Sequence, residues 1–211
     1  MALTIRLEQE QDRGTVEALT REAFWNLYVP GASEHLVLHN LRGSDGFIHD
    51  LDFVAELDGM LVGNIVYTRS NILDASGRRH GVATFGPVSV LPVWQNRGIG
   101  SALIRHSLAA AAALGHTAVV IYGHPEYYGR FGFVGGKQYG IAASDGRYMK
   151  ALLAKELHNG ALQDVSGRFI EDPAFAVTES ALEAFDAQFP HKEKAETDSQ
   201  KAFAILASAL A

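Results

Sequence analysis

At residues 88–101 the chain reads Val88-Ser89-Val90-Leu91-Pro92-Val93-Trp94-Gln95-Asn96-Arg97-Gly98-Ile99-Gly100-Ser101, and this stretch decides the fold. It begins as a β-type run, passes through a glycine-containing turn, and leads into an apolar, alanine-rich segment typical of a helix. The first N–H groups of a helix have no partner within it, and the helix dipole favours negative charge there. Glycines also let a phosphate approach the main chain closely. The stretch therefore predicts an anion site built from backbone donors.

Two side chains of the turn are expected to strengthen this site. Arg97 would add a charge-assisted contact with the anion, and Ser101 would add a hydroxyl. The glycine pattern excludes two common nucleotide motifs, because no third glycine stands at the dinucleotide-binding spacing and no Gly-Lys-Ser/Thr is present for a Walker loop. A Gly-x-Gly pair alone also fits a tight strand-to-helix turn, so the nature of the ligand has to come from further motifs.

The segments around the turn predict a mixed sheet. Strand-like runs at 53–57, 61–67 and 82–91 are separated by Asp-Gly and Ser-Gly turn sequences, which indicates three antiparallel strands. The run at 117–122 follows the predicted helix 99–114, and a strand–helix–strand order makes the two flanking strands parallel. Other predicted elements are a strand over 3–7, a helix after Asp12, helices over 34–41 and 125–131, and a strand over 148–157.

The last part of the chain is predicted to be an extension of this core. Residues 178–189 and 199–210 have the apolar spacing of helices, and the segment 192–198 between them is strongly charged. We therefore divide the chain into a core domain, 1–158, and a C-terminal extension, 159–211. The extension is expected to pack on its own core, to cover the cleft, or to pack on a partner chain in a homodimer.

Composition limits the classes of partner. The chain has 211 residues, of which 47% are hydrophobic and 20% charged, and this suits a globular protein with one core. It has no cysteine, which excludes a thiolate nucleophile and cysteine-based metal sites. A net charge of −6 gives no support to nucleic-acid binding, and we expect a cytoplasmic protein without a membrane partner because no signal sequence or bilayer-spanning apolar run is present. Local donors must then hold any polyanionic ligand.

Two motifs resemble those of the GNAT acyltransferase superfamily. The run Val90-Leu91-Pro92-Val93-Trp94-Gln95-Asn96-Arg97-Gly98-Ile99-Gly100 matches the superfamily pattern Val-x-Pro-x-x-Gln/Arg-x-x-Gly-Ile-Gly. Further on, Pro125-Glu126-Tyr127-Tyr128-Gly129-Arg130-Phe131-Gly132-Phe133 contains the pattern Tyr-x-x-x-Gly-Phe, which often follows the second parallel strand. The chain departs from the pattern after that strand, since many members have an asparagine where Gly123-His124-Pro125 stands here. The resemblance covers residues 1–158.

This resemblance implies both a fold and an activity. The fold would be α/β (α+β), a mixed and mostly antiparallel sheet with a central parallel pair, flanked by helices. The activity would be transfer of an acetyl group from acetyl-CoA to a primary amine of a small molecule or peptide, directly and in a ternary complex, without a metal. Two alternatives stay open: a non-catalytic sensor or interaction domain that binds acyl-CoA, and an acyltransferase that uses another acyl donor.

The resemblance also assigns roles to residues. The backbone N–H of Val90 would stabilise the negative oxygen that forms during attack, and Tyr128 would be the general acid that protonates the leaving thiolate. The strand edge from Val88 through Ser89 to Val90 would bond the pantetheine amides. The remaining expected contacts with the cofactor come from the turn and from the second motif: Gln95, Asn96, Arg97, Gly98, Ile99, Gly100, Ser101, Tyr128 and Arg130.

Three further roles stay open from the sequence. His80, Glu56, His124 and Glu126 are candidates for the general base, and water or a partly neutral amine would also serve. Phe24, Trp25 and Tyr28 could line an acceptor pocket or could simply pack in the core. His35 and His39 stand at i, i+4, but no His-Glu-x-x-His completes a zinc motif, so no metal is predicted.

Overall fold

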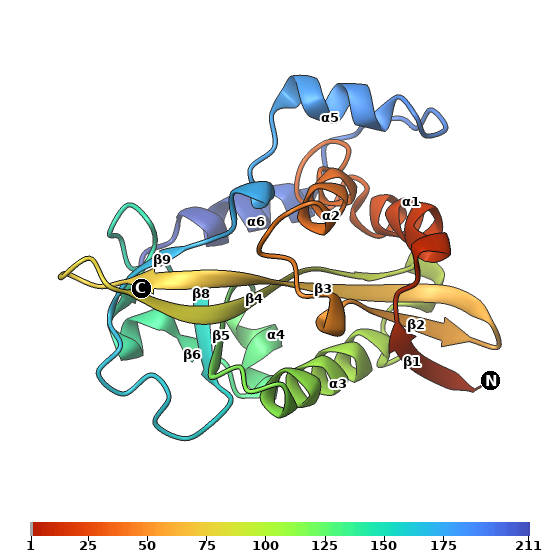
Figure 1. Cartoon of the computed structure of the whole chain (residues 1–211). Coiled ribbons are helices and arrows are strands. Elements are labelled where there is room, and N and C mark those ends of the chain that lie inside the picture. The colour runs from red at the N-terminus through yellow and green to blue at the C-terminus, as the bar shows by residue number, and fades with distance from the viewer. Residues whose placement is uncertain (1) are drawn as a thin grey trace.

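The β-type runs of the chain gather into one mixed sheet, which the computed structural model describes, with its covering helices, for residues 2–211 (Figure 1). The strands in this range are β1 (Leu3–Leu7), β2 (Phe53–Leu57), β3 (Met60–Leu73), β4 (Arg79–Val90), β5 (Ala118–Tyr122), β6 (Val134–Gly135), β7 (Ile141–Ala142), β8 (Leu152–Glu156) and β9 (Gly167–Ile170). Their order along the sheet is β1-β2-β3-β4-β5-β8-β6, and β9 joins this sheet by pairing with β3 and β7.

The strand directions confirm the predicted combination of antiparallel and parallel strand pairs. Strands β1, β2, β3 and β4 pair antiparallel in sequence order, and β5 pairs antiparallel with β8. Between these two groups, β4 and β5 pair parallel, with Ala83 opposite Val119. The helix α3 (Ile99–Ala113) makes the crossover between them. A mostly antiparallel sheet with a central parallel pair is therefore present, as predicted.

A bulge interrupts the pairing of β3 with β4. Ile65 pairs with Val88, but Tyr67 pairs with Phe85, so β4 contains one residue more than β3 across this interval. Pro87 lies within the interval and has no N–H to donate to a ladder, and sheets accept such residues at bulges. A bulge also bends its strand and increases the local twist. The last residues of β4 consequently take a different course from the first.

Helices cover both faces of the sheet (Figure 1). Successive residues of a strand point to opposite faces, and β2 shows this clearly: Phe53 packs in the core with α3, whereas Val54 packs in the core with α1 (Arg13–Phe24) and α2 (Glu34–Arg42). The face of α3 also carries α4 (Pro125–Tyr128). Apolar cores thus hold the central strands from both sides.

The C-terminal segment packs on the rest of the same chain. It contains β9, α5 (Glu179–Asp186) and α6 (Asp198–Ser208). Thr197 Oγ1 donates to the Asn26 carbonyl at 2.9 Å and Ser199 Oγ to the Leu27 carbonyl at 2.8 Å, which fixes the start of α6 against the end of α1. Because β9 pairs with β3, the sheet continues past residue 158. Whether 1–158 forms a domain by itself stays a prediction.

Some predicted elements have different bounds in the structure. The strand predicted over 61–67 extends to Leu73, because its second half pairs with the first half of β4 and its last three residues also pair with β9. The helix predicted over 125–131 is α4 followed by a 3₁₀ turn, which ends at Gly132 with φ 84°. The strand predicted over 148–157 is the shorter β8. No helix of residues 2–211 has the length and apolarity that crossing a membrane requires.

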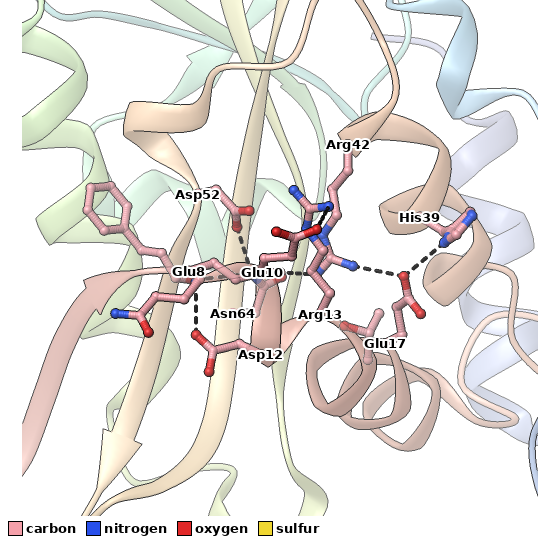
Figure 2. Close-up of polar contacts among 12 residues, drawn as sticks. Glu8, Glu10, Asp12, Arg13, Glu17, His39, Arg42, Asp52 and Asn64 are labelled. Carbon is pink, nitrogen blue, oxygen red and sulfur yellow. Dashed lines mark hydrogen bonds and ion pairs between the residues drawn. The ribbon is translucent and has the colours of Figure 1, made fainter.

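A buried polar cluster ties β1, α1 and α2 to the sheet (Figure 2). Arg42 lies between two carboxylates, with Nη2 at 2.6 Å from Glu8 Oε1 and Nη1 at 2.8 Å from Glu17 Oε1. Beside it, Asn64 donates from Nδ2 to Asp52 Oδ1 at 3.1 Å. Burial raises the pKa of Asp52 well above its usual range, and the negative charge of Glu8 raises it further. Asp52 therefore favours its protonated form in the folded protein.

The Asp52→Asn variant should have a flatter pH dependence of stability than the natural chain. A carboxyl group with a raised pKa in the folded state favours folding at acidic pH, and this contribution is lost as the pH rises from about 4 through the raised pKa. Asparagine resembles the protonated acid and does not ionise. Urea unfolding over a series of pH values measures the slope, and Asp50→Asn, at an exposed position, is the control. Equal slopes for the natural chain and Asp52→Asn would contradict the assignment.

Candidate active site

A large cavity opens where β4 and β5 separate. Their parallel register joins only Ala83 and Val119, so the part of β4 beyond the bulge has no partner on that edge. The cavity has a volume of about 1030 Å³. Its wall includes Val88 and Val90 of β4 and Tyr122 at the end of β5. A free strand edge beside a cavity offers backbone N–H and C=O groups to an extended ligand.

Backbone alternation shows which groups of β4 face this opening. The Leu91 N–H donates to the Val62 carbonyl on β3 at 2.9 Å, and successive N–H groups of a strand point to opposite edges. The N–H groups of Val90 and Val88 consequently face the open edge. Gln95 donates from Nε2 to the Val90 carbonyl at 3.0 Å, so this side chain braces the turn against the strand.

Ser89 is turned away from the opening. Its side chain is fully buried, and its Oγ donates to Thr20 Oγ1 of α1 at 3.0 Å. By the same alternation its backbone N–H faces β3. Of the three strand residues predicted to contact the cofactor, the structure therefore presents Val88 and Val90 to the cavity but not Ser89.

The turn before α3 has the backbone form of an anion cradle. Asn96 has φ 59° and Gly98 has φ 83°, and Gly98 is the N-cap of α3 without a side-chain cap. The N–H of Ala102 bonds the Gly98 carbonyl at 2.9 Å, whereas the helix geometry leaves the N–H groups before Ala102 without partners inside the helix. The turn residues that line the cavity are Gln95, Asn96, Gly98, Ile99, Gly100 and Ser101.

Two arginines of the predicted site lie at its margin. The Arg97 guanidinium is 4.8 Å from the centre of the Trp94 ring and does not line the cavity. Arg130 does line it: its Nε donates to the Tyr127 carbonyl at 3.0 Å, and its guanidinium is 4.5 Å from the centre of the Tyr127 ring. The Tyr127 hydroxyl lies close to Gly100, so this side chain contacts the turn as well as packing against the core.

Tyr128 lines the cavity and lies among other aromatic rings. The centres of the Phe85 and Phe133 rings are each 5.8 Å from the centre of its ring. Its ring also covers Gly123, because a Cβ atom there would clash with Tyr128 Cε2. The absence of a side chain at Gly123 thus makes room for the ring of Tyr128. Burial raises the pKa of Tyr128, so the phenol stays protonated.

The far end of the cavity is formed by the ends of α1, α2 and α6. Phe24 and Tyr28 of the predicted aromatic cluster line it, and the Tyr28 ring stacks on Phe203 of α6 with ring centres 4.3 Å apart. Trp25 instead faces the C-terminal segment, where its Nε1 donates to the Glu193 carbonyl at 2.9 Å. The extension therefore supplies one wall of the cavity.

The four base candidates from the sequence have different surroundings. His124 lines the cavity, whereas Glu126 does not. His80 Nε2 lies 2.8 Å from Asp74 Oδ2, and Glu56 is paired with Arg6 at 2.7 Å. These last two are occupied by structural ion pairs.

Two carboxylates that line the cavity were missed by sequence reasoning. Glu34 is the first residue of α2, and Glu171 follows β9 in the C-terminal segment. Burial raises the pKa of Glu171 to about 7 and also raises that of Glu34. Neither residue stands in a recognisable motif, and only the tertiary fold brings them to the cavity, so the sequence carried no signal for them.

The two histidines at i, i+4 are held by different carboxylates. His35 Nε2 is 3.1 Å from Asp186 Oδ1, and His39 Nδ1 is 2.9 Å from Glu17 Oε1. Within residues 2–211 no group of three or more His, Cys, Asp or Glu side chains is arranged to hold a metal ion.

The sequence and the fold agree on one class of protein. Residues 50–135 match the family profile of the acetyltransferase (GNAT) domain. The chain is 30% identical over 132 residues to the uncharacterized N-acetyltransferase YhbS of Escherichia coli (strain K12). The aligned residues make up 62% of this chain and 73% of that protein. The chain therefore belongs to the GNAT acetyltransferase family.

Other relatives and solved structures agree with this assignment. The uncharacterized N-acetyltransferase YjhQ of E. coli (strain K12) is 34% identical over 85 residues, 39% of this chain and 45% of that protein. The crystal structure of E. coli YhbS in complex with CoA has a TM-score of 0.71 at 23% identity, covering 82% of this chain and 91% of that one. A GNAT family acetyltransferase from Brucella melitensis in complex with acetyl-CoA has a TM-score of 0.68 at 28% identity, covering 83% and 99%.

Proposed function

We propose that this protein is an N-acetyltransferase that moves the acetyl group of acetyl-CoA directly to a primary amine. The observation that carries the proposal is the free edge of β4, which runs along the cavity and ends at the uncapped N-terminus of α3. An extended amide chain with a pyrophosphate at one end fits these two features in order. Solved structures of the same fold hold CoA and acetyl-CoA, which supports this choice of ligand.

The turn and the strand edge bind different parts of the cofactor. The N–H groups of Gly98, Gly100 and Ser101 bind the pyrophosphate, because unpaired donors at a helix N-terminus favour anions even in a chain of net charge −6. The pantetheine amides bond the open edge at Val88 and Val90. Arg130 lies exposed at the margin, where it reaches the phosphates.

The transfer itself needs three groups around the thioester. The amine nitrogen attacks the carbonyl carbon, a C–N bond forms, the C–S bond breaks, and the electron pair leaves on sulfur. The Val90 N–H on the open edge stabilises the negative oxygen of the intermediate. Tyr128 gives its phenolic proton to the departing thiolate, which is reasonable because burial keeps this phenol protonated.

The proposal is tested by binding and turnover together. Titration calorimetry with acetyl-CoA measures binding, and release of free thiol in the presence of a panel of primary amines measures transfer. Binding with turnover is the expected result. Binding without turnover of any amine would favour a non-catalytic acyl-CoA sensor, and no binding would overturn the proposal.

Tyr128→Phe should lower kcat by about a hundredfold or more while the Kd for acetyl-CoA changes little. The variant removes the proton donor but keeps the ring that packs with Phe85 and Phe133. Tyr148→Phe, which removes a hydroxyl from an exposed position outside the cavity, is the matched control. Thiol-release kinetics and calorimetry give the two quantities, and an unchanged kcat would exclude Tyr128 as the acid.

A further inference from the structure

The far end of the cavity contains two carboxylates without a positive partner. Glu34 and Glu171 both line the cavity, and within residues 2–211 neither forms an ion pair with lysine, arginine or histidine. Burial of an unpaired carboxylate is unfavourable, and a cationic ligand would relieve it. The far end of the cavity is therefore suited to positive charge, in contrast to the anion cradle at the turn.

Glu34 has the surroundings of an anchoring group. Its Oε2 accepts the Ser33 N–H at 2.9 Å, which fixes the carboxylate at the start of α2. Burial raises the pKa of the nearby Tyr28 phenol, and the charge of Glu34 raises it further. Burial raises the pKa of Glu34, whereas the hydrogen bond from the main chain lowers it and leaves the other carboxylate oxygen for a ligand.

Glu171 has the surroundings of a proton acceptor. No hydrogen bond joins its carboxylate to another group of residues 2–211. The ring of Phe169, two residues before Glu171, lies 6.0 Å from the ring of Tyr122 at the end of β5. Tyr122 directly precedes Gly123, the residue that the ring of Tyr128 covers. Glu171 thus belongs to the side of the cavity where the proposed acid lies. Its pKa near 7 suits proton transfer at neutral pH.

The rest of this end of the cavity is largely apolar. The stacked rings of Tyr28 and Phe203 form part of its wall, together with Phe24, Leu27, Phe175 and Leu206. The two carboxylates come from different elements and lie near different tyrosines. An alkyl chain with an ammonium group at each end matches this arrangement of two anionic points and apolar walls.

We propose that the acceptor is a short aliphatic diamine, held at one end by Glu34 and deprotonated at the other by Glu171. This inference rests on the proposed acetyl transfer. The reacting ammonium gives one proton to Glu171, and its nitrogen then attacks the thioester carbonyl. The bond to sulfur breaks, the second nitrogen proton is lost to water, and the thiolate takes a proton from Tyr128. The product is a monoacetylated diamine whose free ammonium remains on Glu34.

Thiol release with diaminobutane, butylamine and aminobutanol tests this proposal on the natural chain. The three amines have the same carbon chain, and only the diamine carries a second positive charge. A charge-assisted hydrogen bond to Glu34 should give diaminobutane a kcat/KM about ten- to a hundredfold higher than that of the other two. Equal kcat/KM values for the three amines would overturn the proposal without the need for any variant.

Two variants separate the roles of the carboxylates. Glu34→Gln should raise KM for diaminobutane and remove most of its advantage over aminobutanol. Glu171→Gln should instead lower kcat for every amine, by about a hundredfold. Glu179→Gln makes the same charge change on α5, at an exposed position outside the cavity, and is the matched control. A diamine preference that survives in Glu34→Gln, or an unchanged kcat in Glu171→Gln, would contradict the assigned roles.

Calorimetry distinguishes a failure of this inference from a failure of the proposed function. Acetyl-CoA should bind Glu34→Gln and Glu171→Gln with nearly the affinity of the natural chain, which also shows that the variants fold. If acetyl-CoA binds but diaminobutane is not acetylated, only the diamine assignment falls. If acetyl-CoA does not bind the natural chain at all, both proposals fall.

Discussion

Gly98→Asp should weaken the binding of acetyl-CoA by about a hundredfold or more. Gly98 lines the cavity as the N-cap of α3, and nothing lies within 4 Å of the position that a Cβ would take. An aspartate there places a carboxylate in the proposed pyrophosphate site, where it accepts the free N–H groups of the first turn. It therefore competes with the phosphates for their donors and repels them. Loss of two charge-assisted hydrogen bonds is enough for the expected effect.

Gly98→Ala is the control that isolates the added charge. Gly98 has φ 83°, a conformation that side-chain-bearing residues adopt only at a cost, so both variants carry backbone strain. The difference between their Kd values for acetyl-CoA reports the carboxylate alone. Thermal unfolding should be affected about equally in the two variants. If aspartate and alanine weaken binding to the same extent, the anion site is not at this turn.

The turn and the central sheet could be predicted because short stretches of sequence determine them. An Asp-Gly between β-type runs is a local signal for a hairpin. Gly98-Ile99-Gly100 before an apolar segment is likewise a local signal for a turn that leads into a helix. The same holds for Tyr128, whose motif fixes its distance from Gly132 on a short helical turn. Local sequence signals therefore predicted the proposed cofactor-binding side of the cavity.

The proposed acceptor end of the cavity could not be predicted from the sequence, because only tertiary contacts build it. Glu171 reaches the cavity through the pairing of β9 with β3, and β9 is a run of four residues with weak strand character. Phe203 reaches the cavity because the Thr197 and Ser199 hydroxyls bond the chain just after α1. No periodicity within one segment carries this information. Predicting it would require knowledge of which segments far apart in the sequence are neighbours.

Ser89 and Arg97 were predicted to contact the cofactor but do not line the cavity, because their side chains face elsewhere. A resemblance assigns contacts to a whole stretch, whereas a strand presents only alternate residues to one edge. Ser89 belongs to the set that faces β3 and α1, where its hydroxyl meets Thr20. The Arg97 guanidinium packs over the face of the Trp94 ring. The motif therefore located the stretch correctly in the sheet, but it did not separate residues that face the cavity from residues that support them.

Arg42→Met should lower the free energy of unfolding by about 3–5 kcal/mol. The side chains of Arg42 and Glu8 are only 5% and 2% exposed, and their atoms Nη2 and Oε1 are 2.6 Å apart (Figure 2). The angle of this contact does not fit a hydrogen bond, so the attraction is mainly between charges. Methionine keeps most of the apolar stem but removes the cation, which leaves Glu8 buried beside Asp52 without compensation. Urea unfolding at neutral pH measures the loss.

Arg13→Met is the matched control, and Glu8→Gln is the test of cause. Arg13 lies 4.0 Å from Glu10, with side chains 45% and 90% exposed, and such surface pairs contribute less than about 1 kcal/mol. In the Arg42→Met background, Glu8→Gln removes the stranded charge and should recover a large part of the lost stability, because the two residues act as a pair. If Arg42→Met costs as much stability in the Glu8→Gln background as in the natural chain, then Arg42 stabilises the fold through packing or through Glu17 instead.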